Sequence, residues 1–352
     1  MADSRVDPSA PTAAPDDALQ RYDARDETVI GSNIGGWPVE VEPFRDERFR
    51  SLYHRLQYWA LRGAQGGALA LPGPLREGVV RGVAALGKTF DARHTGAARR
   101  FIGAALPGAS PGEVERLVKE SWRHLMRVAL VSEGVDRHVK GHRLADHYEV
   151  HMHPDAARVL EERRGSLLIT GHMGHWEASC PGVTALGFTP VYAIGKAPRN
   201  DFVAQQIQRM REGQGMRLIS RYGAMQAVPQ AVRAGANVGM LMDHRPRQKP
   251  IIAPFFGRPA GCDRSAGVLI RRVRAPLVFY GCYGIPGDDP LKSWRFELRF
   301  TRVIFPEDLA GLGPVEVATR VNQELERLLL HRPEQVFWLH DRFKGAPEPG
   351  AD

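Results

Sequence analysis

Cysteine is scarce in this chain: only three of its 352 residues are cysteines, at positions 180, 262 and 282. Their odd number and wide separation exclude a disulfide framework and a zinc ribbon, which both need closely spaced or paired thiols. We therefore expect Cys180, Cys262 and Cys282 to behave as small apolar core residues in a reducing compartment.

Long hydrophobic runs are also absent. The nearest candidate, residues 57–75 (QYWALRGAQGGALALPGPL), is interrupted by an arginine, glycines and prolines. A membrane-spanning helix needs about 20 predominantly apolar residues. The first 18 residues are acidic and rich in proline and alanine, without the apolar core of a signal peptide. The sequence therefore predicts no spanning helix, but it is compatible with a segment that lies in the membrane interface.

Acidic residues are outnumbered by basic ones, 40 to 48, which gives a formal net charge of +8. Such an excess favours an anionic partner, namely a membrane surface, a phosphorylated carrier or substrate, or nucleic acid. The aromatic residues are not interleaved along a basic strand, so a nucleic-acid stacking surface is not expected. A hydrophobic content of 43% excludes wholesale disorder.

The order of apolar patterns predicts four segments. Residues 1–45 are expected to be a loose tail, 46–150 a helical region, 151–345 an α/β core and 346–352 a second tail. In the helical region, Ser110, Pro111 and Glu113 have the spacing of a helix start with a capping box. The core alternates expected strands (166–170, 190–194, 237–242, 276–283 and 295–301) with expected helices (201–214, 224–235, 265–274 and 314–331). This alternation is typical of a layered α/β fold, in which ligands bind at the carboxyl ends of the strands.

One cluster of polar residues lies at such a strand end. The stretch GHMGHWE, residues 171–177, directly follows the expected strand SLLIT. In a continuous helix His172 and Glu177 would lie about 140° apart, but a turn containing glycines can bring them together. An imidazole held by a carboxylate acts as a general base. A polar loop without catalytic function, or a zinc site that also uses His175, are the alternatives.

A second cluster extends over residues 240–267. Asp243 follows an expected strand, and Arg245, the pair Phe255–Phe256 and then Arg264 come after it. Basic residues beside paired aromatics suit a ligand with a phosphate at one end and an apolar chain at the other. The alternative is a solvated basic loop beside a core aromatic pair.

Four stretches together resemble a known family. GHMGHWE is similar to the His-x4-Asp/Glu signature of the glycerolipid acyltransferases, and to the form found in the lipid A lauroyl/myristoyl acyltransferase family, which includes the phosphatidylinositol mannoside acyltransferases. MLMDHR with APFFGRPAGCDRSAG resembles a second element of that family, and RPEQVFWLHDRFK, residues 332–344, resembles its ending. The helical residues 106–134 match the region before its catalytic domain. The resemblance covers about residues 50–345.

The resemblance implies an O-acyltransferase with a layered mixed sheet flanked by helices and an N-terminal helical region. Such an enzyme moves a fatty acyl group from a thioester, on acyl carrier protein or coenzyme A, to a hydroxyl of a glycolipid or lysolipid. By analogy His172 is the general base and Glu177 orients it. Arg209, with Arg211 close by, matches an arginine near the reacting carbonyl or the phosphopantetheine of the thioester. Asp243 matches an aspartate that either positions the acceptor or supports the site. No metal or redox cofactor is needed, because the thioester is already activated.

The resemblance also implies a peripheral location on the cytoplasmic face of the bacterial inner membrane. Three departures from the family pattern concern the acceptor: His244 replaces a glutamine, Ala193 replaces an arginine, and the residues GCDRS (261–265) stand where a threonine is common. Two other functions are compatible with the sequence, an acyl-thioester or lipid hydrolase and a non-catalytic lipid-binding protein of the same fold.

Overall fold

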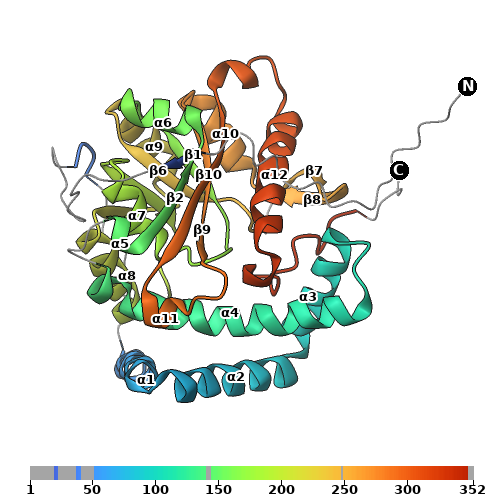
Figure 1. Cartoon of the computed structure of the whole chain (residues 1–352). Helices are drawn as coiled ribbons and strands as arrows, with labels where there is room; N and C mark the ends of the chain where they lie inside the picture. The colour runs from blue at the N-terminus through green and yellow to red at the C-terminus, as the bar shows by residue number, and fades with distance from the viewer. Residues whose placement is uncertain (1–19, 23–36, 41–50, 140–143, 247–248, 348–352) are drawn as a thin grey trace, which may run out of the picture.

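The computed structural model describes residues 20–22, 37–40, 51–139, 144–246 and 249–347 (Figure 1). Most of the predicted tail at 1–45, and residues 348–352 of the second one, lie outside the described residues. Within the first, Gln20–Tyr22 form a short strand, β1, which pairs antiparallel with β2. The prediction of a loose tail did not include this pairing.

The core is a mixed eight-stranded sheet with the order β1-β2-β10-β9-β3-β6-β4-β5. Strands β9, β3, β6, β4 and β5 run parallel to one another, whereas β10 pairs antiparallel with β9 and parallel with β2. The bounds are β2 Tyr148–Met152, β3 Leu167–Thr170, β4 Val191–Gly195, β5 Met216–Ser220, β6 Asn237–Leu241, β9 Leu277–Gly284 and β10 Phe296–Ile304.

Both faces of this sheet are buried. Along β3, Leu167 and Ile169 belong to one hydrophobic cluster and Leu168 to the other, as the period of two in a strand requires. The first cluster includes residues of α9 (Ala224–Arg233), α10 (Arg264–Val273) and α12 (Pro314–His331). The second includes residues of α6 (Pro154–Glu161), α7 (Ser179–Ala185), α8 (Asp201–Gly213) and α11 (Pro290–Ser293). Strands buried on both faces explain the continuous apolar runs that mark them in the sequence.

Most of the expected elements are confirmed. The five expected strands correspond to β3, β4, β6, β9 and β10, and the four expected helices to α8, α9, α10 and α12. The structure also contains strands that the sequence did not predict, namely β2, β5 and the separate hairpin of β7 (Ile251–Phe255) and β8 (Arg258–Cys262). This hairpin contains Pro254 and Pro259, which cannot donate to a central ladder but are tolerated at the edge of a two-stranded sheet.

Four long helices lie between β1 and β2 in the chain: α1 (Leu52–Ala70), α2 (Gly73–Phe90), α3 (Ala92–Ala105) and α4 (Pro111–His138). The predicted capping box of α4 is confirmed, with Ser110 accepting from the Glu113 amide and the Glu113 carboxylate accepting in return. A short α5 (Leu144–His147) follows. Helices α1 and α2 form an outer layer beyond α4 (Figure 1). Among the described residues, none of the helices combines the length and apolar character required to cross a membrane.

Helix α4 also holds the C-terminal part of the chain. The buried Ser121 hydroxyl donates to the Val336 carbonyl at 2.8 Å and accepts from the Trp338 amide at 3.1 Å. The Trp338 ring is fully buried against Phe101 of α3. One serine therefore anchors a segment that lies more than two hundred residues later in the chain.

We expect Ser121→Ala to lower the free energy of unfolding by about 1–3 kcal/mol, because it removes two buried hydrogen bonds. The Trp338 amide and the Val336 carbonyl then keep only the bond between them, at 2.9 Å. Urea unfolding followed by tryptophan fluorescence measures the change. Ser132→Ala is the matched control, since the Ser132 hydroxyl bonds only the Val128 carbonyl of its own helix. Equal losses in the two variants would contradict the anchoring role of Ser121.

Candidate active site

The loop after β3 depends on two glycines. A Cβ at Gly171 would lie 3.0 Å from the Asp243 carboxyl carbon, so the absence of a side chain lets that carboxylate approach the backbone. Gly174 has φ +54°, and a Cβ there would lie 2.0 Å from the Cys282 carbonyl oxygen. Only glycine fits both conditions at 174. The loop is therefore pressed against β9 on one side and against the end of β6 on the other.

Asp243 holds His172 at two points. One carboxylate oxygen of Asp243 is 2.8 Å from His172 Nδ1, and the other accepts from the His172 backbone amide at 2.6 Å. The two residues follow β3 and β6, which are adjacent parallel strands, so their strand ends meet at one edge of the sheet. Burial raises the pKa of Asp243, but the charge and hydrogen bonds of His172 outweigh it and hold that pKa well below the usual range. The carboxylate is therefore ionised and fixes Nδ1 of His172 as the donor.

The predicted pairing of His172 with Glu177 differs from what the structure shows. The Glu177 carboxylate forms a two-pronged ion pair with Arg211 of α8, at 3.1 Å from Nε and 2.6 Å from a terminal nitrogen. The physical reason is the path of the loop, which turns after Gly174 into the helical turn before α7 and directs Glu177 toward α8. The carboxylate that orients His172 is that of Asp243.

His244 lies against the other side of the imidazole. Its Nε2 atom is 3.1 Å from Nε2 of His172, and the two ring centres are 4.1 Å apart. In the neutral form of His172 that donates from Nδ1 to Asp243, Nε2 carries the lone pair, and His244 is then the donor between the two rings. Desolvation and the neighbouring His172 lower the pKa of His244 to about 4. His244 is therefore neutral at pH 7 and occupies the atom of His172 that would accept a proton.

The C-terminal segment closes the site. Arg342 is almost fully buried and donates to the backbone carbonyls of Met242 at 2.9 Å and His244 at 2.7 Å, so it fixes the residues that flank Asp243. His340 stacks on His244 with ring centres 4.5 Å apart. The backbone amide of Phe337 donates to the His172 carbonyl at 2.9 Å. The resemblance of residues 332–344 to a family ending was noted in the sequence, but these roles were not predicted.

The other predicted site residues are not all brought together. Arg245 lies beside the site, with its backbone amide donating to Nε2 of His340 and its side chain to the Lys344 carbonyl. Phe256 is half-buried and packs on Phe255. Arg264 is exposed at the start of α10. Arg209 faces a groove between α8 and α1 instead of His172.

The assignment of Phe255 to substrate binding is corrected by the structure. Its side chain is fully buried and packs against Phe101 and Phe343, with the Arg342 guanidinium 5.2 Å from its ring centre. A side chain enclosed by core residues has no surface to offer a ligand. The core alternative for this aromatic residue is the one that the structure shows.

His175, which the zinc alternative would use, also points into the protein interior. Its buried ring packs against His124 and Phe296. Within the described residues, the group whose ligand atoms lie close enough to hold a metal ion is instead His172, Asp243 and His244, with all atoms within 4.8 Å of one another. Both Asp243 oxygens are already engaged by His172. The imidazole of His172 is thus oriented by Asp243.

Comparison with known proteins agrees with this geometry. The model of the bacterial lipid A biosynthesis acyltransferase family matches residues 45–345, and the chain therefore belongs to that family. A lipid A biosynthesis palmitoleoyltransferase from Escherichia coli (strain K12) is 22% identical over 269 residues, which cover 75% of this chain and 83% of the relative. A lipid A biosynthesis acyltransferase from Shigella flexneri shows the same identity and coverage. The chain is thus an acyltransferase of a family that acts on lipid acceptors.

The buried His124, which contacts the loop that carries His172, predicts that the stability of the fold depends on pH. His124 is buried, its Nε2 bonds the Gly174 carbonyl at 2.9 Å, and desolvation lowers its pKa from 6.5 to about 4. Between these two values the unfolded chain binds more protons than the folded one, so stability falls as the pH is lowered. We expect a loss on the order of 1–2 kcal/mol from this group between pH 6.5 and 5.

Urea unfolding at several pH values measures this slope in the wild type and in His124→Gln. Glutamine keeps a donor for the Gly174 carbonyl but removes the titrating group. The variant should therefore lose less stability on acidification. A slope identical to that of the wild type would show that His124 does not contribute.

Proposed function

We propose that this protein transfers a fatty acyl group from an acyl thioester, carried by acyl carrier protein or coenzyme A, to a hydroxyl of a glycolipid or lysolipid. The observation that carries the proposal is the contact of His172 with Asp243, which leaves Nε2 of the imidazole as an oriented proton acceptor at the edge of the sheet. The family to which the chain belongs supports acyl transfer to a lipid.

In the proposed mechanism, the acceptor hydroxyl takes the place of His244 at Nε2 of His172. Nε2 removes the hydroxyl proton as the oxygen attacks the thioester carbonyl, and the ionised Asp243 stabilises the resulting imidazolium through Nδ1–H. The imidazolium then gives the proton to the leaving thiolate when the tetrahedral intermediate collapses. The products are the acylated lipid and the free thiol of the donor, so neither a metal nor a redox step enters.

Glu177 has a positioning role in this proposal. Its ion pair with Arg211 ties the loop that carries His172 to α8. Burial of the guanidinium lowers the pKa of Arg211, but the charge of Glu177 outweighs this and raises it. Breaking this ion pair would loosen the loop. Arg245 and Phe256 are the proposed contacts for the donor and the acyl chain, and Arg264 for a more distant anionic group.

We further propose that the protein works as a peripheral protein on the cytoplasmic face of the bacterial inner membrane, where acyl thioesters and lipid acceptors meet. A lipid hydrolase that uses the same His172–Asp243 pair is the second candidate. Its specific support is the open position at Nε2 of His172 once His244 moves away, which water can reach as well as a hydroxyl.

The central prediction concerns the two carboxylates. Asp243→Asn should reduce the rate of acyl transfer about 10³- to 10⁴-fold, because the amide no longer selects the productive tautomer of His172. His172→Ala should abolish transfer. Glu177→Gln should have a smaller effect on the rate, because it acts on the loop and not on the imidazole.

The measurement is transfer of a radiolabelled acyl group to a total bacterial lipid extract, with acyl carrier protein and coenzyme A thioesters tested separately. A labelled lipid formed by the wild type identifies the acceptor by its mass. Free fatty acid formed in its place would favour the hydrolase. Loss of activity in Glu177→Gln with full activity in Asp243→Asn would overturn the assigned roles.

A further inference from the structure

The exposed large hydrophobic side chains of the described residues are concentrated on two helices. Ten of the thirteen that lie on the surface belong to α1 and α2, and the most exposed of these ten are Phe90 at 81% and Leu52 at 70%. The ten are Leu52, Tyr53, Leu56, Trp59, Leu61, Leu75, Val79, Val83, Leu86 and Phe90. Single exposed apolar residues are ordinary, but a contiguous apolar surface indicates an interaction site.

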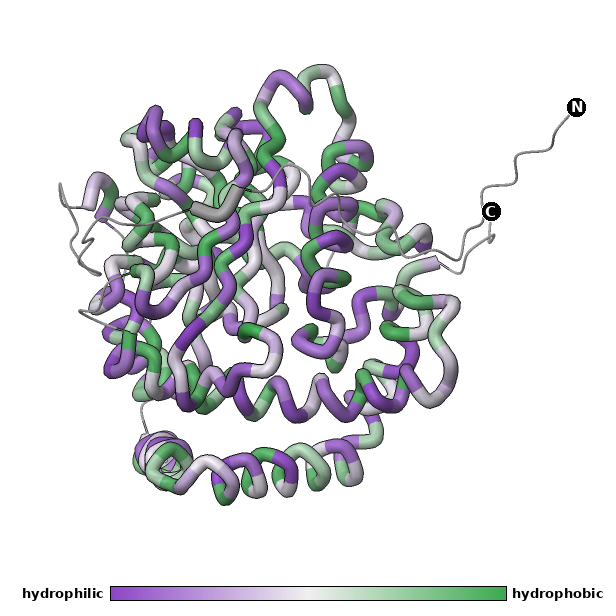
Figure 2. The backbone as a smooth tube through the Cα atoms, viewed as in Figure 1, coloured by the Kyte–Doolittle hydropathy of each residue, from purple (hydrophilic) through white to green (hydrophobic). Residues whose placement is uncertain are grey.

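Helix α2 carries this surface as a continuous stripe. Its exposed positions 75, 79, 83, 86 and 90 recur at steps of three and four, which places them on one face. The opposite face, with Val80 and Ala84, is buried toward α4, where Gly87 lies directly against the Trp122 ring. The helix is therefore apolar on both sides, and the outer side has no partner among the described residues. Hydrophobic segments recur along the whole of α2 in Figure 2.

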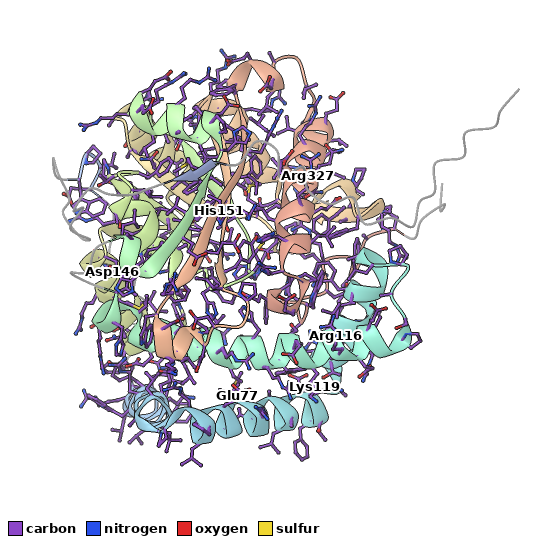
Figure 3. The ribbon with its side chains drawn as sticks, viewed as in Figure 1. Glu77, Arg116, Lys119, Asp146, His151 and Arg327 are labelled. Carbon is purple, nitrogen blue, oxygen red and sulfur yellow. The ribbon has the colours of Figure 1, made fainter. Side chains whose placement is uncertain are left out.

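The acidic residue of this region is directed inward. Residues 51–90 contain five lysines and arginines and a single carboxylate, Glu77. Glu77 lies on the side of α2 that faces α4, as Figure 3 shows, and pairs with Arg127 at 2.8 Å and Arg81 at 3.0 Å. Arg62 pairs with Glu133 of α4. The outer surface of the two helices thus presents no carboxylate that would repel an anionic partner.

A groove of about 410 Å³ opens beside this surface, between α1 and α8. Its lining contains two arginines, three aromatic rings and two amides, and no carboxylate: Arg55, Tyr58, Trp59, Phe202, Gln205, Gln206 and Arg209. Arg55 lies 5.5 Å from the ring centre of Phe202, and Arg209 bonds the Gln205 amide oxygen at 3.1 Å. Neither guanidinium pairs with a carboxylate among the described residues. Two unpaired guanidiniums beside amides are suited to an anion such as a phosphate.

Helix α8 connects this groove to the candidate active site. Residues 209 and 211 are about 200° apart around a helix, at 3.6 residues per turn, so their side chains leave on opposite sides. Arg209 accordingly lines the groove, whereas Arg211 binds Glu177 in the loop that carries His172. An anion held in the groove is therefore one helix diameter away from that loop.

We propose that the outer face of α1 and α2 lies on an anionic lipid bilayer, with a lipid headgroup phosphate seated in the groove between Arg55 and Arg209. The inference deepens the proposed function, on which it rests: it states which surface contacts the membrane and which residues select anionic lipid. Two features favour a lipid surface over a second copy of this chain. The outer face of α1 and α2 presents no carboxylate, and Arg55 and Arg209 at its edge would be repelled by the same arginines of a second copy.

The apolar part is tested by flotation of the full-length protein through a sucrose gradient with vesicles of phosphatidylcholine, with and without 30% phosphatidylglycerol. The test variant Val79→Asp/Val83→Asp places charges on the stripe, at side chains that are 41% and 46% exposed. Val268→Asp/Val315→Asp is the matched control, since these side chains are 48% and 49% exposed elsewhere on the surface. The wild type and the control should bind the anionic vesicles, and the test variant should lose at least tenfold in affinity.

The groove is tested with Arg55→Gln/Arg209→Gln against Arg271→Gln/Arg320→Gln, which removes the same charge from other exposed positions. The groove variant should lose most of the preference for anionic over neutral vesicles, and the control should keep it. If both variants lost this preference equally, the net charge of the protein would explain it, and the groove would be rejected as a phosphate site.

Three further outcomes would overturn the assignment of this surface to the membrane. They are no flotation of the wild type, unchanged flotation of Val79→Asp/Val83→Asp, or a wild type that elutes as a dimer in gel filtration while this variant elutes as a monomer. Flotation needs no turnover, so His172→Ala should float as the wild type does. A protein that floats but transfers no acyl group would leave the membrane face standing and reject the proposed function.

Discussion

The pair of hydrogen bonds from His172 to Asp243 is the contact on which the rest of the site depends. The same carboxylate holds the imidazole and the backbone amide of one residue, so it fixes both the ring and the loop. This requires adjacent strand ends, supplied by the parallel strands β3 and β6, and a glycine at 171 that leaves room for the carboxylate. The contact therefore needs all three features together: the adjacent strands β3 and β6, the glycine at 171 and the ionised Asp243.

Around this contact, three distant parts of the chain act as supports. Arg342 holds the backbone on both sides of Asp243, Glu177 ties the histidine loop to α8 through Arg211, and His124 of α4 holds the Gly174 carbonyl. Each support uses a buried or partly buried polar side chain. The geometry of the His172–Asp243 contact is set by strands and helices, as a preorganised site requires.

The strand ends that carry His172 and Asp243 were predictable from the sequence, because buried strands leave plain apolar runs. The contact between these two residues was not predictable. Strands β3 and β6 are neighbours in the sheet although β4 and β5 come between them in the chain, and no local sequence pattern indicates this order. The spacing of His172 and Glu177 suggested a direct contact, but the turn at Gly174 sends the glutamate elsewhere. Phe255 was ambiguous for a similar reason: an aromatic pair beside basic residues has the same pattern in a core and in a binding site.

The contact of Arg342 with the carbonyls of Met242 and His244 has a consequence for biosynthesis. The histidine, the aspartate and their strands leave the ribosome well before the residue that locks them, because about 100 residues separate Asp243 from Arg342. At a synthesis rate of about 5–20 residues per second, this interval lasts roughly 5–20 seconds. The nascent chain thus passes through a period in which the sheet can form but the reactive imidazole is not yet held in place, and the site becomes competent only when the last part of the fold docks on α4.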